Sequence, residues 1–543
     1  MGPKVKEHLE KDWLLSHRSI SDELKLHFKS YADTGKECLE KARLVARGDL
    51  QKPGVDYRET YAPVVKFISL RVLLTFAGLR KFETRHFDIE SAFLHSKIDD
   101  GLELYMQQPT GFADGTNWVC KLRKAIDGLC QAARQFYLRL DEILKEIGYS
   151  RLCADWAIWV CENGTFIAVH IDDIFAAGSE VQVMRAFEQI NWFICMNDLG
   201  PMHRYLGLDI SYVDSTFYVS QAHYIEKILS EFNLSSSHGV QTPMVTYERW
   251  DRVDSDLLDP PQNELYQSAI GMLLYVMHGT RPDISFPVIK LSQYASCPRL
   301  IHWDAVKQII RYLKGTLTRS LALGIITTNH DPSVDNNLYA FFDSAHADNA
   351  NKLLTCSYLF LLFGGLIACS TKVQRTVALS STEAEYMAGT EAVCEAVWIK
   401  GLTDAIFRDS TLEIKWPIEI RGDNQGSLAV ANNPQFHQRT KHITLRQQFI
   451  SDMVDDGLIS VLYVPTSVIL ADSLNKALPQ DIHIHHWSIL PLVDRPLCVA
   501  PATLSMALEL SALLRKCKWP YVACDNLFRD ERALKRHMVL KEL

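Results

Sequence analysis

The chain has 543 residues, which is too long for one compact domain and is typical of about three to four domains. Hydrophobic residues make up 47% and charged residues 22%, the ordinary mix of a globular protein with several cores. The net charge of -8 excludes a protein that is basic overall, but it leaves room for a local basic groove that contacts phosphates. Thirteen cysteines without a regular framework indicate reduced thiols rather than a disulfide scaffold.

The sequence predicts neither a signal peptide nor a membrane span. The N-terminus, Met1-Gly2-Pro3-Lys4, is charged and has no signal-peptide core. The longest apolar run, residues 358–369, contains a glycine pair and is too short to span a bilayer, so it predicts a buried strand or hairpin. We therefore expect no membrane role and an intracellular protein.

Elements in the first half alternate between strand-like and helix-like patterns. Residues 1–37 are polar and offer few landmarks, and the alternation runs from about 38 to 245. One face within residues 122–147 carries apolar residues at helical spacing. Two apolar strands within residues 165–177 flank Asp172–Asp173, as in a hairpin turn.

The second half contains a helical region and a further strand–helix alternation. A turn-rich stretch, residues 251–263, predicts a boundary. Helical patterns fill residues 264–315, and strands alternate with helices from about 338 to 478. The residues beyond about 480 are expected to form a separate tail.

Two strand-like runs in the first half end in carboxylates. Asp88 closes one, and Asp172–Asp173 follows another. Three carboxylates on neighbouring strand ends can hold two Mg²⁺ ions, which prefer oxygen ligands. Such ions suit in-line transfer of a nucleotide to a primer 3′-hydroxyl. An isolated Asp-Asp pair is usually a solvated turn, so the surrounding motifs must decide.

Those motifs resemble the reverse transcriptase of copia-type retrotransposons. They follow the family's order over about residues 38–480, and an ordered set is far more specific than any single motif. The matching segments are residues 41–48 (KARLVARG), 57–65 (YRETYAPVV), 88–94 (DIESAFL), 105–109 (YMQQP), 170–173 (HIDD), 280–284 (TRPDI) and 311–316 (RYLKGT). The resemblance implies a right-hand polymerase in which Asp88, Asp172 and Asp173 bind two metal ions.

The resemblance also implies substrate contacts. Phe93 would be the aromatic wall that excludes a ribose 2′-hydroxyl, although a core phenylalanine explains this residue equally well. Basic residues would contact template or triphosphate, with a solvated strand face as the alternative. The implied substrate-binding residues are Lys41, Arg43, Arg47, Phe93, Gly128 and Gln131.

A second set of acids follows in the last strand–helix alternation. Asp343 and Asp423 end strands, whereas Glu385 and Asp472 stand at helix starts, behind Ser380-Ser381-Thr382 in the case of Glu385. Four acids in these places can converge on a two-metal centre that hydrolyses phosphodiesters. The order Asp, Glu, Asp, Asp resembles ribonuclease H of the same family, which implies that all four are catalytic metal ligands.

Several positions depart from the family pattern. His170 stands where the family has tyrosine, and residues 126–134 (IDGLCQAAR) lack an aromatic residue, a lysine and a proline. Asp127 adds negative charge where a triphosphate should pass. In the tail, Cys517, Cys524 and His537 faintly resemble half of a zinc finger, but an amphipathic helix is the better interpretation because a structural zinc site needs four ligands.

The fold expected from these observations is a multidomain α+β and α/β protein: fingers, palm and thumb followed by a ribonuclease H-like domain. The expected domains are 1–37 (extension or partial fingers), 38–250 (fingers and palm), 251–335 (thumb and connection), 336–480 (ribonuclease H-like) and 481–543 (tail). No protease or integrase motif is found, so we expect a piece of a larger polyprotein.

The leading hypothesis is an RNA-directed DNA polymerase with ribonuclease H activity. It predicts two Mg²⁺ ions per active site, with Mn²⁺ as a substitute. The expected partners are an RNA template, a DNA primer, the RNA–DNA hybrid, deoxynucleoside triphosphates and other parts of the polyprotein. The expected location is the cytoplasm, in virus-like particles, and the nucleus. Two alternatives stay open: a decayed copy that only binds nucleic acid, and a copy that retains the nuclease alone.

Overall fold

The computed structural model divides the chain into two units, Met1–Arg495 and Pro496–Leu543, and every described residue belongs to the first. The described residues are 42–99, 101–109, 116, 118–245, 255–324, 338–345, 354–374, 378, 380–408, 414–425 and 444–494, with the strands β1 (Leu15–Ser16) and β2 (Lys25–Phe28). Lys41 and the cysteine–histidine pattern of the tail lie outside them. Among the described helices, none is long and apolar enough to cross a membrane.

The region expected to be the palm, and called the palm below, contains a six-stranded antiparallel sheet with the order β11-β4-β10-β9-β8-β7. Its strands are β4 (Glu83–Ile89), β7 (Tyr149–Arg151), β8 (Ile158–Cys161), β9 (Phe166–His170), β10 (Asp173–Gly178) and β11 (Met196–Pro201). The central strands are apolar on both faces, as strands covered on both sides must be.

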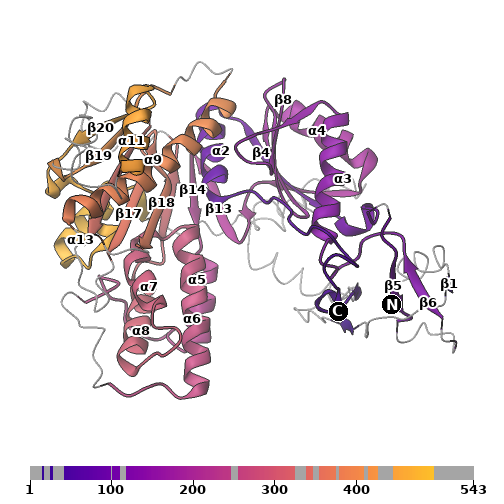
Figure 1. The fold of residues 1–543 in the computed structure, drawn as a ribbon, viewed down its shortest axis with the longest axis horizontal. Coiled ribbons are helices and arrows are strands. Elements are labelled where there is room, and N and C mark those ends of the chain that lie inside the picture. The colour runs from indigo at the N-terminus through magenta and orange to yellow at the C-terminus, as the bar shows by residue number, and fades with distance from the viewer. Residues whose placement is uncertain are drawn as a thin grey trace, which may run out of the picture. The chain divides into compact units, whose positions relative to one another are not determined.

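Helices cover both faces of this sheet (Figure 1). Helices α3 (Ala132–Glu146) and α4 (Glu180–Phe193) pack with Ile174 and Ala176 of β10 in one core. Because side chains alternate along a strand, Phe175 and Ala177 face the other side, in the core that contains α2 (Phe67–Arg80). Residues 69–78 of α2 are all buried, which is expected for a helix whose faces are mostly apolar, with Arg71 as the one buried charge in this stretch.

The fingers elements are short. Strands β1, β6 (Val119–Leu122) and β5 (Leu104–Gln107) form one sheet, and β2 pairs with β3 (Ala42–Val45). Two single 3₁₀ turns, η1 (Gly48–Leu50) and η2 (Ala92–His95), lie close to them in sequence.

A second antiparallel sheet and a group of helices follow the palm. The sheet has the order β12-β13-β14-β15-β21, and the helices share one hydrophobic cluster. The strands are β12 (Arg204–Tyr205), β13 (Leu208–Val213), β14 (Thr216–Ser220), β15 (Arg319–Leu323) and β21 (Leu492–Asp494). The helices are α5 (Ala222–Glu231), α6 (Pro260–Gly279), η3 (Pro282–Ile284), α7 (Ser285–Ser292) and α8 (Leu300–Gly315).

The last sheet has the order β18-β17-β16-β19-β20, antiparallel over its first three strands and parallel from β16 to β20. Its strands are β16 (Leu338–Ala345), β17 (Thr355–Leu362), β18 (Gly365–Val373), β19 (Ile418–Gly422) and β20 (Ile459–Tyr463). The accompanying helices are α9 (Ser381–Ile406), α11 (Thr444–Asp455), η5 (Thr466–Val468), α12 (Asp472–Asn475) and α13 (Gln480–Ile489). Three antiparallel strands followed by two parallel strands, with helices packed on the sheet, form the ribonuclease H-like arrangement.

The expected fold class is confirmed, and the apolar run at 358–369 forms the β17–β18 hairpin. One boundary differs from the expectation. Residues 480–494 form α13 and β21, and β21 pairs with β15 as the fifth strand of the middle sheet. They are therefore part of the first unit rather than of a separate tail.

Candidate active sites

The first three predicted acids meet at one end of the palm sheet. Asp88 on β4 stands opposite Asp173 on β10 in the antiparallel register. Asp172 lies in the turn between β9 and β10, and its carbonyl accepts a hydrogen bond from the Ile89 amide at 3.0 Å. Ile171 has a φ of 59°, so the turn is tight and left-handed at that point. The sheet register therefore brings the backbones of this set together, while the carboxylate oxygens found within 4.8 Å of one another among the described residues are those of Asp343, Glu385 and Asp423.

A histidine that the sequence analysis did not select contacts this set. His86 Nε2 lies 3.1 Å from Asp173 Oδ1. The His86 ring also makes an edge contact with Tyr205, whose side chain is buried and whose ring centroid is 5.7 Å away. Because side chains alternate along β4, residues 86 and 88 share a face, so the strand pattern alone could have pointed to His86.

The loop that carries Gly128 is joined closely to the fingers. The Ala46 amide donates to the Asp127 carbonyl at 2.7 Å, and Gly128 has a φ of +87°. A Cβ built on Gly128 would stand 2.1 Å from the Ala46 carbonyl oxygen, so only glycine fits. The Cys130 thiol, where the family has lysine, lies 3.1 Å from the Gly48 carbonyl oxygen. The Cys130 side chain is thus accommodated by an internal hydrogen bond.

The other predicted substrate residues are in varied settings. Gln131 is fully buried, and its amide donates to the Asp56 carbonyl, so the structure gives it an internal partner. Arg47 forms an ion pair with Asp49 at 2.6 Å. Phe93 is partly buried against Phe136, with ring centroids 6.4 Å apart. The backbone of Arg43 lies in β3, paired with His27. Their contacts with substrate stay predictions.

The second set of acids converges in the last sheet. Asp343 lies in β16, Glu385 in the first turn of α9, and Asp423 directly after β19. One carboxylate oxygen of each lies within 4.8 Å of the others. Ser380 caps α9 by accepting a hydrogen bond from the Glu383 amide, as its N-terminal signature predicts. The parallel pairing of β16 with β19 brings two of these acids to the same sheet end.

The fourth acid, Asp472, joins this set through shared partners. It begins α12, and its carboxyl is hydrogen-bonded to that of Asp343. Lys476 Nζ lies 2.6 Å from Asp472 Oδ1 and 2.9 Å from Asp343 Oδ2. Asn475 donates to the same Asp343 oxygen at 2.9 Å. The four predicted acids therefore form one cluster, with Lys476 as a member that sequence reasoning missed.

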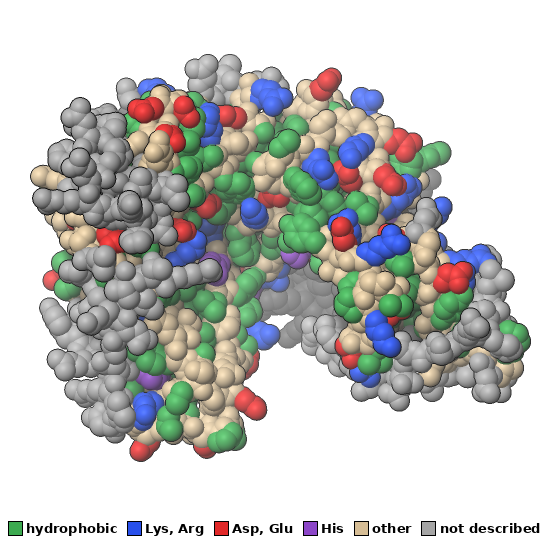
Figure 2. Space-filling view, in the orientation of Figure 1, with side chains coloured by type: hydrophobic (Ala, Val, Ile, Leu, Met, Phe, Trp, Pro, Cys, Tyr) green, Lys and Arg blue, Asp and Glu red, His purple; other side chains and the backbone are tan. Residues whose placement is uncertain are grey.

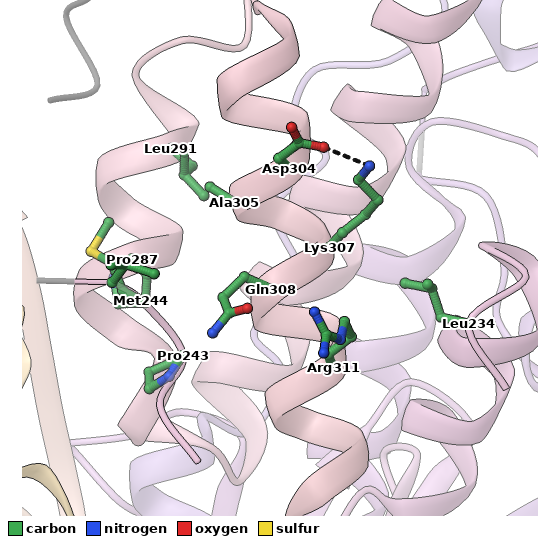
Figure 3. Close-up of a pocket in the computed structure, with 11 residues that line it drawn as sticks. Leu234, Pro243, Met244, Pro287, Leu291, Asp304, Ala305, Lys307, Gln308 and Arg311 are labelled. Carbon is green, nitrogen blue, oxygen red and sulfur yellow. Dashed lines mark ion pairs between the residues drawn. The ribbon is translucent and has the colours of Figure 1, made fainter. Parts of the chain in front are cut away.

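The pocket in Figure 3 is separate from both acid sets. It has a volume of about 380 Å³ and is lined mainly by α7 and α8, and none of the seven acids lines it. Lys307 pairs with Asp304 at 2.6 Å, and Arg311 Nε donates to the His238 carbonyl at 3.0 Å. Both cations already have partners in the chain, so we assign the pocket no substrate.

Comparisons with known proteins agree with the motifs. A family model described as reverse transcriptase (RNA-dependent DNA polymerase) matches residues 15–246. The retrovirus-related Pol polyprotein of transposon TNT 1-94 from Nicotiana tabacum is 35% identical over 454 residues, which are 81% of this chain and 33% of that polyprotein. A transposon Ty5-1 protein from Saccharomyces cerevisiae is 31% identical over 319 residues, which are 57% of this chain and 99% of that protein. The chain belongs to the copia-type Pol polyproteins.

This copia-type chain spans about a third of the plant Pol polyproteins it matches. Among solved structures, a foamy viral protease–reverse transcriptase in complex with double-stranded DNA is 14% identical, covers 85% of this chain and 68% of its own, and has a TM-score of 0.47. A ribonuclease H1 from Halobacterium salinarum is 19% identical, covers 25% of this chain and 93% of its own, and has a TM-score of 0.18. The family assignment depends on the sequence relatives and not on these distant likenesses.

The charges in the second cluster fit a divalent cation. Burial, with repulsion from Asp343 and Asp423, raises the pKa of Glu385 to about 9, and Glu385 Oε2 is buried without a hydrogen-bond partner. Burial and the hydrogen bond with Asp343 raise the pKa of Asp472 to about 7. Such clustered oxygens are hard ligands with too little positive charge nearby, which is the donor set that Mg²⁺ prefers.

Charge is mixed on the one face of the copia-type chain that Figure 2 shows. On the face shown in Figure 2, Lys and Arg side chains are interspersed with Asp and Glu. This mixture agrees with the net charge of -8. Any basic path for a nucleic acid must therefore be local, as the composition indicated.

Proposed function

We propose that this chain is an RNA-directed DNA polymerase with a second centre that cuts the RNA strand of an RNA–DNA hybrid. The observation that supports the proposal is the position of the seven family acids: the backbones of three lie at one end of the palm sheet, and the carboxyl groups of four cluster in the last sheet. Bound Mg²⁺, or Mn²⁺ in its place, would supply Lewis acidity at the attacking and leaving oxygens in both centres.

In the palm, Asp88, Asp172 and Asp173 would hold the metal ions, while His86 fixes the direction of the Asp173 carboxylate. Phe93 stands five residues after Asp88, at a position where its ring would exclude a ribose 2′-hydroxyl. The substrates would be an RNA template, a DNA primer and deoxynucleoside triphosphates. The protein would be located in cytoplasmic virus-like particles and in the nucleus. Its protein partners would be other parts of the polyprotein.

Primer extension tests the polymerase. A DNA primer on an RNA template should be extended with Mg²⁺, and Asp173→Asn should lower the rate roughly 100-fold or more. Asp209→Asn is a matched control, because Asp209 pairs with an exposed arginine on β12 and not with the acid set. Folded wild-type protein that extends no primer would refute the polymerase proposal.

Hybrid cleavage tests the nuclease separately. An RNA–DNA hybrid should be cut in its RNA strand, and Asp423→Asn should abolish cutting, since Asp423 is one of three acids whose oxygens converge. Asp404→Asn on α9 is the control, because Asp404 is half-exposed and pairs with Lys400 in its own helix. Equal cleavage by both variants would contradict the assignment.

A second candidate function is nucleic-acid binding without catalysis in a decayed copy. Its support is local: His170 replaces tyrosine beside the palm acids, and residues 127, 130 and 133 differ from the family near the fingers. If decay at these places abolishes synthesis, restoring tyrosine at 170 and the family residues at the other three should create activity. Unchanged rates in the restored protein would argue against decay there.

A further inference from the structure

Lys476 lies inside the four-acid cluster. Its ammonium nitrogen is 2.9 Å from Asp343 Oδ2 and 2.6 Å from Asp472 Oδ1, so it bridges two predicted metal ligands. The lysine follows Asp472 by four residues, one helical turn later, at the end of α12. About a third of its side chain, 34%, is exposed. The ammonium therefore has both a place among the acids and a path to solvent.

This contact leaves the two halves of the cluster with unequal amounts of positive charge. The Asp343–Asp472 half contains the ammonium. In the other half, oxygens of Asp343, Glu385 and Asp423 lie within 4.8 Å of one another, and Glu385 Oε2 is buried without a hydrogen-bond partner. Electrostatics therefore favours a first cation in the second half, where negative charge is least compensated.

A purely structural role for Lys476 is less well supported by its surroundings. Helix α12 and its flanks are already fixed by hydrogen bonds from Ser357 to the Ala471 carbonyl at 2.9 Å and from Thr371 to the Leu474 carbonyl at 2.8 Å. The Lys476 amide also donates to the Asp472 carbonyl at 3.1 Å, a backbone bond that does not depend on the side chain. Its two ion-pair partners are Asp343 and Asp472.

We propose that Lys476 is a built-in counter-cation of the nuclease centre. It occupies the Asp343–Asp472 half in the metal-free protein and moves toward solvent when a divalent ion takes that half. Ions therefore bind in order, first among Asp343, Glu385 and Asp423, and then in place of the ammonium. This inference rests on the proposed nuclease function and makes Lys476 a positioning residue. The long, flexible lysine side chain suits such a movement.

Binding of Mn²⁺ to the full chain tests the order. All proteins carry Asp88→Asn and Asp173→Asn, so that binding at the palm does not obscure the nuclease centre. The wild-type centre should bind two ions with affinities at least about tenfold apart. Lys476→Met should tighten the weaker of the two by about tenfold or more. Lys476→Arg keeps the charge and should resemble the wild type.

Thermal unfolding supplies a readout that does not depend on catalysis. In EDTA, Lys476→Met should unfold at a lower temperature than the wild type, because two buried carboxylates lose their counter-charge. Saturating Mn²⁺ should remove that difference. Lys372→Met is the matched control, because Lys372 pairs with Glu391 at 3.0 Å on an exposed surface and should respond to neither condition.

The outcomes separate the two proposals. Unchanged Mn²⁺ affinities in Lys476→Met, or a loss of stability that persists in saturating Mn²⁺, would overturn the counter-cation role. A Lys476→Met protein that folds only with Mn²⁺ would support it, and one that folds in neither condition would overturn it. Mn²⁺ binding that Asp423→Asn leaves intact would instead overturn the nuclease proposal itself.

Discussion

Arg71 is a buried cation whose removal should separate parts of the first unit. It lies in the middle of α2 and is 6% exposed. Its guanidinium donates to the Ile367 carbonyl of β18 at 3.1 Å, to the Gly279 carbonyl of α6 at 2.9 Å, and to the His278 carbonyl. One side chain thus joins the palm helix, the last sheet and the C-terminal end of α6, where backbone carbonyls need partners.

The magnitude follows from these three bonds. Arg71→Met keeps much of the side-chain volume but leaves two buried carbonyls and one partly buried carbonyl without this donor, and each loss costs about 1–3 kcal/mol. Relief of the cost of burying a charge offsets part of this sum. We expect a net loss of about 3–5 kcal/mol in the free energy of unfolding.

Urea unfolding of the full chain, followed by tryptophan fluorescence, measures this loss. Arg80→Met is the matched control from the same helix, because Arg80 only lies over the rings of Phe76 and Phe82 at 6.0 and 5.5 Å. The control should lose about 1 kcal/mol or less. If both variants unfold at the same urea concentration, the three carbonyl bonds do not hold these elements together.

Burial lowers the pKa of His483 to about 4, below its unfolded value of about 6.5. The free energy of unfolding should therefore be highest above pH 6.5 and fall by about 3 kcal/mol as pH drops toward 4, because the unfolded state binds the proton more readily. His483→Gln should reduce this fall in urea midpoints measured from pH 7 to 4.5. Gly128→Ala should destabilise the fingers by about 1–3 kcal/mol, because its Cβ would meet the Ala46 carbonyl oxygen. Faster proteolysis of the fingers and slower primer extension would report this loss. Gly54→Ala, with a φ of +79° but no atom within 4 Å, should lose less. Glu385→Gln should raise stability in EDTA by roughly 2 kcal/mol while it abolishes hybrid cleavage, because it removes a buried carboxylate whose pKa is raised to about 9.

Local patterns in the sequence predicted the parts of the fold that depend on neighbouring residues. The Asp172–Asp173 turn was predicted because apolar strands on both sides leave a short polar connection, and the structure places β9 and β10 there. The start of α9 was predicted from its serine cap, which accepts the expected backbone hydrogen bond. Such signals lie within a few residues of one another and need no tertiary information.

Features that depend on distant residues were missed. Strand β21 has three residues, Leu492–Asp494, and its place is set by pairing with β15, more than 160 positions earlier. Its local sequence is too short to predict a strand. Lys476 was missed for a similar reason, since only the folded chain brings Asp343 to the helix that carries it. The alternation of β4, by contrast, was sufficient to suggest His86.

The location of the family departures explains how this chain can keep its fold whatever its activity. One hydrophobic cluster contains α2, palm strands, the middle sheet and the last sheet, so folding of the first unit depends on these buried elements. Asp127 and Cys130 lie outside that cluster, and both take part in hydrogen bonds with the segment 46–51. Changes there leave the buried core intact. Stability and catalysis must therefore be measured separately in this chain, because selection on one does not preserve the other.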